Sequence, residues 1–159
     1  MAEAEEVDKF VEKVQASAKY SQLDSDLVRQ IALEELRNQK DRTSALKSTR
    51  TRLHRLAGAY LAPKLDYAKW VDIFQSLPND NPESIKDACE RMMKLHASTQ
   101  ERLLFITSFY QTCLAPISPV ESVLDLACGL NPLAIPWMQL QKDCTYYACD
   151  VVDPMIAFL

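Results

Sequence analysis

Apolar residues recur at helical spacing three times in the first third of the chain. The first stripe consists of Val7, Phe10, Val11, Val14 and Ala18. The second begins after Asp24, a residue type suited to an N-cap, and the third runs from about Thr43 to Leu61, where Pro63 ends it. Apolar positions separated by three and four residues are typical of amphipathic helices. Three such helices in succession predict a small helical bundle.

The middle of the chain continues the helical pattern with interruptions. Residues 66–77 predict a short helix, and the Pro-, Asn- and Asp-containing segment 76–84 predicts a linker. Asn81, followed by Pro82 at the first helical position, starts another helix that ends near Leu95. Ser98 and Glu101 have the spacing of a capping box, which predicts a helix reaching about Cys113.

The pattern changes after Glu121. Residues 122–126 predict a buried strand, residues 132–140 a helix, and residues 145–149 a second strand. Asp153, Pro154 and the apolar residues after them predict the start of another helix. A strand, helix and strand in this order open a parallel sheet. The predicted fold class is therefore α + α/β, a helical bundle followed by an incomplete Rossmann-like sheet.

Composition narrows the class of protein. The chain has 159 residues, 48% hydrophobic and 25% charged, and no apolar run long enough to cross a bilayer. Its acidic N-terminus lacks the apolar segment of a secretory signal. The five cysteines form no CxxC pair and have no zinc spacing with histidine, so we expect reduced thiols, no metal and a cytoplasmic location.

The net charge of −4 conceals a basic segment. Residues 37–64 carry 8 basic and 1 acidic side chains, whereas the segments on either side are acidic. The basic residues with candidate roles in RNA binding are Lys40, Arg42, Lys47, Arg50, Arg52 and Arg55. Such a run is often only a solvated helix face, but clustered charge is also what phosphate binding requires.

The turn after the first predicted strand is the strongest candidate for a ligand site. Gly129 is one of two glycines in the chain, and Asp150 follows the next strand 21 residues later. A glycine lets the backbone approach a ligand, and a carboxylate at this spacing suits ribose hydroxyls. The phosphate-binding pattern GxGxxG is missing, which favours a ribose ligand without phosphate such as S-adenosylmethionine. The alternative is a tight turn with no ligand.

At this point the sequence resembles the aminoglycoside-resistance 16S rRNA methyltransferases, which methylate N7 of a guanine in the decoding site. The segment VLDLACGLNPLAIPWM is similar to their first motif, HASTQERL (residues 96–103) to their HASTRERL segment, and RTRLHRLAGAYL (residues 50–61) to the end of their RNA-binding domain. The three motifs stand in the family's order. Gln100 departs from the arginine that many members have there.

The resemblance implies a domain plan and roles for matching residues. Residues 1–77 would form a helical RNA-binding domain, 78–117 a helical linker and 118–159 the first part of the methyltransferase domain. Arg102 matches the arginine that binds the cofactor's methionine carboxylate, and Asp150 the ribose-binding aspartate. Ala127, Cys128, Gly129 and Asn131 match the turn beside the cofactor. No acid–base residue is expected, and His54 and His96 are interpreted as structural or RNA-facing.

The partner implied by the resemblance is 16S rRNA in the 30S subunit, without a membrane or a metal. From Val123 onward only 37 residues remain in the sequence, so we expect a truncated portion without activity of its own, with an open sheet edge that favours self-association. The alternatives are a non-catalytic RNA-binding module that uses the basic helix, and a methyltransferase of another substrate.

Overall fold

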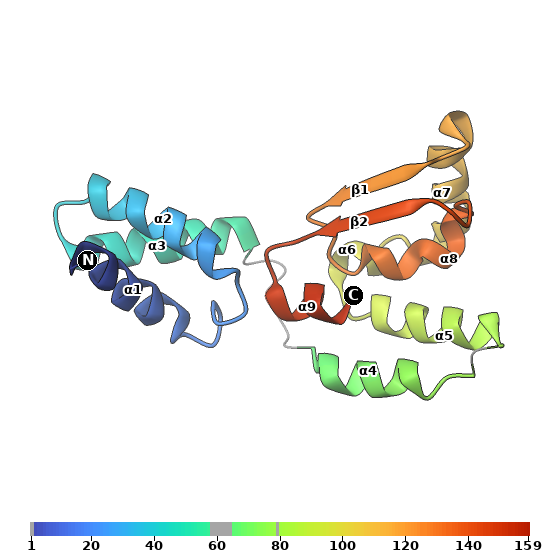
Figure 1. Cartoon of the computed structure of the whole chain (residues 1–159), viewed down its shortest axis with the longest axis horizontal. Helices are drawn as coiled ribbons and strands as arrows, with labels where there is room; N and C mark the ends of the chain where they lie inside the picture. The colour runs from blue at the N-terminus through green and yellow to red at the C-terminus, as the bar shows by residue number, and fades with distance from the viewer. Residues whose placement is uncertain (1, 58–64, 79) are drawn as a thin grey trace. The chain divides into compact units, whose positions relative to one another are not determined.

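The computed structural model describes residues 2–57, 65–78 and 80–159, with side chains described from residue 5 onward. These residues form two compact units (Figure 1). The helical unit contains the described residues up to 57 together with Val151–Asp153, and the sheet unit contains residues 65–150 and Pro154–Leu159. The fold class is α + α/β as predicted, and the three-part domain plan stays a prediction.

Three helices that pack against one another form the helical unit. They are α1 (Ala2–Gln15), α2 (Ser25–Asn38) and α3 (Arg42–Ala57). Asp24 is the predicted N-cap of α2, because its side chain accepts a 2.7 Å hydrogen bond from the Leu27 amide. Val14, Val28 and Leu53 are fully buried between the helices. The predicted bundle is confirmed, whereas the continuation of the third helix to Leu61 and Pro63 lies outside the described residues.

The sheet unit begins with a series of helices, and the first two have side-chain N-caps. The series consists of α4 (Tyr67–Gln75), α5 (Pro82–Met93), α6 (Ala97–Gln100) and α7 (Ile106–Leu114). Asp66 caps α4 through the Lys69 amide, and Asn81 caps α5 through the amides of Glu83 and Ser84. Pro82 is the first residue of α5, where its missing N–H is not needed.

The predicted single helix from Ser98 to Cys113 is wrong. The segment folds as α6, then the 3₁₀ turn Leu103–Phe105, then α7. Ser98 lies inside α6, and its hydroxyl contacts Nδ1 of His96 at 3.0 Å, so it does not form a capping box with Glu101. The side chain that the sequence assigned to a helix end is therefore used to orient a histidine.

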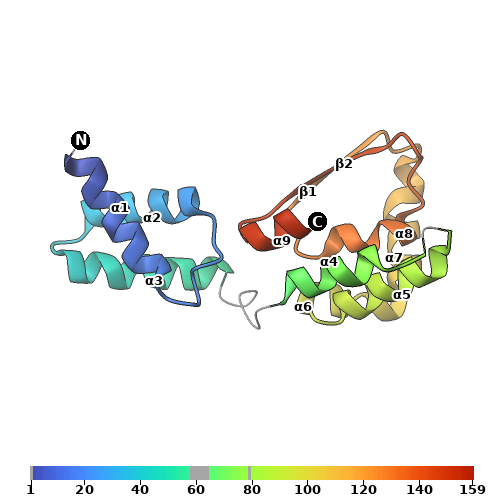
Figure 2. The ribbon, with the colours of Figure 1, turned by 60° about the horizontal axis from the view of Figure 1, so that its bottom comes forward.

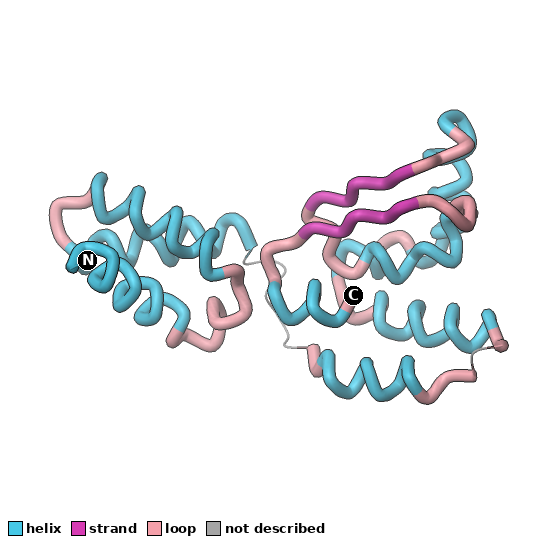
Figure 3. Tube along the Cα trace, viewed as in Figure 1, coloured by secondary structure: helices cyan, strands magenta, loops and turns pink. Residues whose placement is uncertain are grey.

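The sheet consists of two parallel strands, β1 (Ser122–Leu126) and β2 (Thr145–Cys149), at the predicted positions (Figure 3). The predicted helix between them begins as the 3₁₀ turn Asn131–Ala134 and continues as α8 (Ile135–Met138). The last helix is α9 (Asp153–Phe158). The register pairs Leu126 with Cys149, so the carboxyl ends of the two strands are adjacent.

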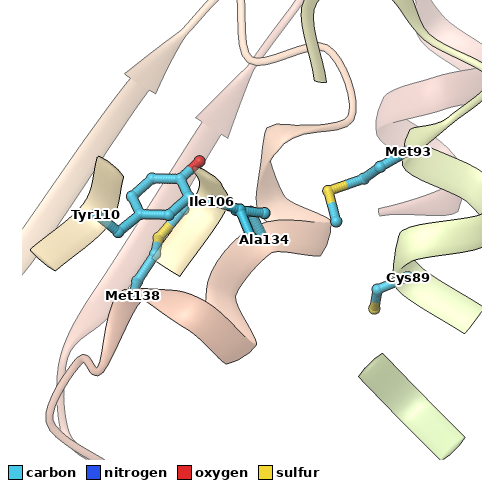
Figure 4. Close-up of a cluster of buried hydrophobic side chains, with 6 residues drawn as sticks. All are labelled: Cys89, Met93, Ile106, Tyr110, Ala134 and Met138. Atoms are coloured by element: carbon cyan, nitrogen blue, oxygen red, sulfur yellow. The ribbon is translucent and has the colours of Figure 1, made fainter. Parts of the chain in front are cut away.

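Helices cover one face of this sheet (Figure 2). Between the helices and this face lies a core cluster of six buried side chains, namely Cys89, Met93, Ile106, Tyr110, Ala134 and Met138 (Figure 4). Tyr146 of β2 packs against this cluster. On the other face Leu124 and Leu126 are 64% and 69% exposed. The prediction of a buried first strand is therefore wrong for that face in these 159 residues.

None of the helices described is both long enough and apolar enough to span a membrane.

Candidate functional site

The candidate site forms where the two parallel strands end. The Gly129 amide donates a 2.9 Å hydrogen bond to Oδ2 of Asp150, and the Cys128 amide donates to the Cys149 carbonyl at 3.0 Å. These two bonds join the turn after β1 to the residue after β2. Ligands of open parallel sheets bind at this edge. The structure thus brings together Gly129 and Asp150, which the sequence paired only by spacing.

The turn has an unusual backbone. Ala127 and Gly129 both have φ near +53°. Glycine adopts this left-handed conformation at little cost, whereas alanine is strained there by contact of its Cβ with the backbone. Such strain persists only where neighbouring structure enforces it, and it concentrates at functional sites. The Asn131 amide closes the turn by donating to the Cys128 carbonyl at 2.9 Å.

The imidazole of His96 occupies the space beside Gly129. A Cβ added at position 129 would lie 2.9 Å from Cε1 of His96. We expected the missing side chain to make room for a ligand, and the described atoms show that it makes room for this ring. His96, interpreted from the sequence as structural or RNA-facing, is therefore a wall of the candidate site.

Opposing charges surround His96. Burial lowers the pKa of the imidazole, the nearby Asp150 carboxylate raises it, and the Arg102 guanidinium lowers it further, with a net shift below the usual value. The ring is therefore neutral at neutral pH, since desolvation disfavours the charged form. A neutral ring keeps one nitrogen as an acceptor and one as a donor.

Arg102 lies on the linker between α6 and the following 3₁₀ turn, close enough to His96 to influence its charge. Its Nε donates a 3.1 Å hydrogen bond to the Ser98 carbonyl, and its guanidinium lies 5.5 Å from the centroid of the Phe109 ring. Arg102 forms no ion pair with any residue that the structure describes. A guanidinium has five donors, so this anchored one can still bind a carboxylate.

Cys128 and Asn131 both face inward. Cys128 is 3% exposed, and burial, with a smaller effect of Asp150, raises the pKa of its thiol to about 11. The thiol is therefore protonated and not a nucleophile at neutral pH. The side chain of Asn131 is held by Asp125 and Tyr110 through hydrogen bonds of 2.7 and 2.5 Å. These two predicted cofactor residues contribute chiefly their backbone to the turn.

Of the basic residues predicted to bind RNA, some form ion pairs within the protein and others form none with any described residue. Arg42 pairs with Glu6, and Arg52 pairs with Glu34 at 2.6 Å and with Glu35 at 3.0 Å. Lys40, Lys47 and Arg55 are exposed and form no ion pair among the described residues. Intramolecular ion pairs thus engage part of the predicted basic face.

Lys47 and Arg50 line a cavity of about 430 Å³ together with Lys19 and His54. Nε of Arg50 is buried without a hydrogen-bond partner among the described residues, while its Nη2 donates to the Lys13 carbonyl at 3.2 Å. We call this cavity the α3 groove, and it gathers three basic side chains, Lys19, Lys47 and Arg50, on one surface of the helical unit. Lys19 was not predicted, because it lies in an acidic stretch of the sequence and joins the groove only through helix packing.

Sequence reasoning also missed Asp125, Tyr146 and Tyr110, which form hydrogen bonds beneath the turn. A signal was present for two of them, because alternation along a strand places Asp125 and Tyr146 at non-apolar positions of a face that otherwise meets the core. Nothing in the sequence pairs them with Tyr110 of α7, which is 21 residues from Asn131.

The chain is similar to proteins of a known family over most of its length. A family model described as ribosomal RNA methyltransferase (FmrO) matches residues 16–159. A 16S rRNA (guanine(1405)-N(7))-methyltransferase of Micromonospora olivasterospora is 38% identical over 142 residues, which cover 89% of this chain and 47% of the relative. The chain spans about half the length of the curated relatives it matches.

Solved structures are also similar to the chain. The 16S rRNA methylase RmtB superposes with a TM-score of 0.72 at 30% identity, over 96% of this chain and 57% of RmtB. The 16S rRNA methyltransferase RmtF, solved in complex with S-adenosyl-L-homocysteine, superposes with a TM-score of 0.64 at 23% identity, over 96% of this chain and 55% of RmtF. At that identity the second likeness shows the fold alone.

Proposed function

Because the chain belongs to the ribosomal RNA methyltransferase (FmrO) family, we propose that it forms the RNA-binding and cofactor-turn portion of an S-adenosylmethionine-dependent 16S rRNA guanine-N7 methyltransferase. The observation that carries the proposal is the hydrogen bond from the Gly129 amide to Asp150, across the ends of two adjacent parallel strands. It builds the edge at which a ribose-containing ligand binds.

The roles that we propose for the cofactor residues come from the family resemblance, and this geometry supports them. Asp150 accepts hydrogen bonds from the ribose hydroxyls, and Arg102 binds the methionine carboxylate. The backbone of Ala127, Cys128, Gly129 and Asn131 lines the cofactor. The fold is one in which a relative binds S-adenosyl-L-homocysteine, the product of methyl transfer, which supports this assignment.

The proposed reaction requires positioning more than acid–base chemistry. Guanine N7 has a lone pair and no proton, so no base is needed to expose it. The new bond forms between N7 and the methyl carbon while the carbon–sulfur bond breaks, and that electron pair returns to sulfur. S-adenosylhomocysteine leaves, and the guanine ring takes the positive charge. Alignment of N7 with the breaking bond is the main contribution expected of the protein.

The basic side of the helical unit supplies the RNA contact in this proposal. Lys40, Lys47, Arg50 and Arg55 remain the residues we assign to phosphates, with Lys19 added from the α3 groove. Arg42 and Arg52 contribute less, because phosphate binding would have to compete with their ion pairs. Phosphate contacts supply affinity and salt dependence, while the folded shape of the RNA supplies selectivity.

The finer parts of the function extend the same proposal. The substrate is the decoding-site guanine of 16S rRNA in the 30S subunit, which places the reaction in the cytoplasm. Methylation there confers aminoglycoside resistance by removing a hydrogen-bond acceptor. The second candidate function, a non-catalytic RNA-binding module, is favoured by one observation: the α3 groove is formed entirely by residues of the helical unit.

The deciding experiment measures S-adenosylmethionine binding to the chain by calorimetry, with Asp150→Ala alongside. We expect binding by the native chain and a loss of at least about tenfold in Asp150→Ala, since a hydrogen-bonded charged group contributes about 1.5–3 kcal/mol. Salt-sensitive association with 30S subunits and no cofactor binding would favour the RNA-binding module. We expect no methyl transfer by the 159 residues alone, since the enzymes they resemble are about twice as long.

A further inference from the structure

A hydrogen-bond network lies directly beneath the Gly129 turn, on the helix-covered face of the sheet. Oδ2 of Asp125 accepts hydrogen bonds from the Tyr146 hydroxyl at 2.5 Å and from Nδ2 of Asn131 at 2.7 Å. Oδ1 of Asn131 accepts from the Tyr110 hydroxyl at 2.5 Å. The network therefore joins β1, β2 and α7 to the residue that ends the turn.

The contact with Asp125 decides which way the Asn131 amide faces. An ionised carboxylate can only accept, so the amide nitrogen must face Asp125 and the amide oxygen must face Tyr110. Tyr110 is then obliged to donate, and so is Tyr146 toward Asp125. The carboxylate of Asp125 thus fixes the orientation of the Asn131 amide, because a flipped amide would turn its oxygen toward Asp125 and lose that hydrogen bond.

The tyrosines remain donors across the accessible pH range. Burial is the largest cause of a raised pKa at both Tyr110 and Tyr146, and at Tyr146 the hydrogen bond to Asp125 raises the pKa further. Tyr110 is 6% exposed, and Tyr146 packs against the core of the sheet unit. The hydrogen bonds of the network are partly buried, and hydrogen bonds are stronger there than at the surface.

The side chain of Asn131 controls the turn through its own backbone. The Asn131 amide donates to the Cys128 carbonyl at 2.9 Å, which closes the four-residue turn that contains Gly129. The amide of Gly129 then meets Asp150. A displacement of Asn131 would consequently shift the backbone that is placed against the cofactor.

From this arrangement we propose that Tyr110 and Tyr146 are positioning residues of the cofactor site, which act through Asn131 and Asp125 to hold the Gly129 turn in its ligand-binding conformation. The inference rests on the proposed function for the identity of the ligand. It assigns α7 a role in cofactor affinity, although Tyr110 lies below the turn and need not touch the ligand.

The test removes one hydroxyl at a time from the full chain. Tyr110→Phe and Tyr146→Phe keep the ring and its packing. Tyr147→Phe is the matched control, because Tyr147 follows Tyr146 in β2 but points to the opposite, exposed face of the sheet. S-adenosylhomocysteine is the probe, with the Kd measured by calorimetry. We expect the Kd to rise about tenfold in each network variant, as for the loss of one hydrogen bond to a charged or amide group, and to be unchanged in Tyr147→Phe.

A double variant separates positioning from general stability. If both tyrosines act through Asn131, the loss of affinity in Tyr110→Phe/Tyr146→Phe should differ from the product of the single losses, because residues in one network are coupled. A loss of affinity no larger than that expected from the fall in melting temperature would assign the hydroxyls a purely structural role and overturn the proposal. Native affinity in both single variants would overturn it as well.

Amide hydrogen exchange at Gly129 tests the network without any ligand. We expect exchange at this amide to accelerate at least about tenfold in Tyr110→Phe and Tyr146→Phe, while the amides of β1 and β2 that pair in the sheet keep their rates. If the native chain does not bind S-adenosylhomocysteine, the proposed function fails, and the exchange rate of Gly129 alone decides whether the network positions the turn. Unchanged exchange would then refute it.

Discussion

At the scale of single residues, the candidate site depends on two residues with positive φ, Ala127 and Gly129, and on the imidazole ring of His96. Ala127 holds a conformation that suits glycine, and Gly129 has no Cβ where the His96 ring lies. Each feature involves a residue that the sequence had marked for the cofactor turn. The backbone strain at Ala127 and the close packing of His96 against Gly129 became visible only in the structure.

Ala127→Gly should stabilise the protein by about 0.5–1 kcal/mol, because glycine adopts φ near +53° without strain, although its unfolded chain has more entropy. Thermal and urea unfolding would measure the change. Ala134→Gly, at a buried position on the 3₁₀ turn Asn131–Ala134 with no positive φ, is the control and should destabilise instead. A destabilising effect of Ala127→Gly would contradict the assignment of strain to this residue.

Gly129→Ala should destabilise the turn for two separable reasons. The left-handed backbone costs about 1 kcal/mol with a Cβ, and that Cβ would lie 2.9 Å from the His96 ring. In a His96→Ala background the steric part should disappear and the backbone part should remain. Unfolding free energies of the two single variants and the double variant measure this coupling. Strictly additive effects would show that the ring does not press on position 129.

At the scale of elements, α3 serves two purposes that its sequence does not separate. Arg52 joins α3 to α2 through Glu34 and the buried Glu35. Hydrogen bonds from Ser48 and then from Arg52 hold the pKa of Glu35 below its usual value. Lys47, on the same helix, lines the α3 groove.

A matched pair of variants distinguishes these purposes. Arg52→Ala should lower the melting temperature, because the buried Glu35 loses a partner, and should change RNA affinity little. Lys47→Ala should leave the melting temperature unchanged, weaken binding to 30S subunits and reduce the slope of log K against log salt by about 0.7–0.9, the share of one phosphate contact. Filter binding at several salt concentrations measures the slope. Equal slopes in Lys47→Ala and the native chain would remove Lys47 from the RNA face.

The stability linked to Glu35 has a definite pH window. Because the pKa of Glu35 is lowered on folding, its contribution is complete above the unfolded value of about 4.3 and is lost as the pH falls through the folded value. The contrast between Arg52→Ala and the native chain is therefore best measured near neutral pH, where the contribution of Glu35 is complete.

At the scale of the whole molecule, we expect a bound ligand to change hydrogen exchange differently in the two compact units. Gly129, Asp150 and Arg102 all belong to the sheet unit, so S-adenosylhomocysteine should protect amides of that unit from hydrogen exchange. At a hundred times the Kd the ligand adds about 2.7 kcal/mol of stability to whatever unfolds with its site. Exchange followed by mass spectrometry would locate the protection. Equal protection of α1, α2 and α3 would show that the two units unfold as one.

Sequence reasoning reached most of the fold and the cofactor turn. The three helices of the bundle, both strands and the caps Asp24 and Asn81 are local features, and local features leave a periodic or positional signal. The predicted capping box failed because the hydroxyl of Ser98 contacts His96, two residues earlier, and not a backbone amide. The prediction that β1 is buried was wrong for one face, because the pattern of apolar residues in a strand does not show which other elements cover it.

What the sequence determined by itself is therefore the set of elements, the glycine turn with its aspartate, the basic segment and the family resemblance. These depend on neighbours in the chain or on short motifs. The tertiary structure alone decided that His96 fills the space beside Gly129 and that Tyr110 and Tyr146 meet at Asn131 and Asp125. It also decided that Arg52 forms ion pairs, whereas Lys47 forms none with the residues that the structure describes. Those contacts join residues far apart along the chain, and only packing selects a side chain's partner among many of the same chemistry.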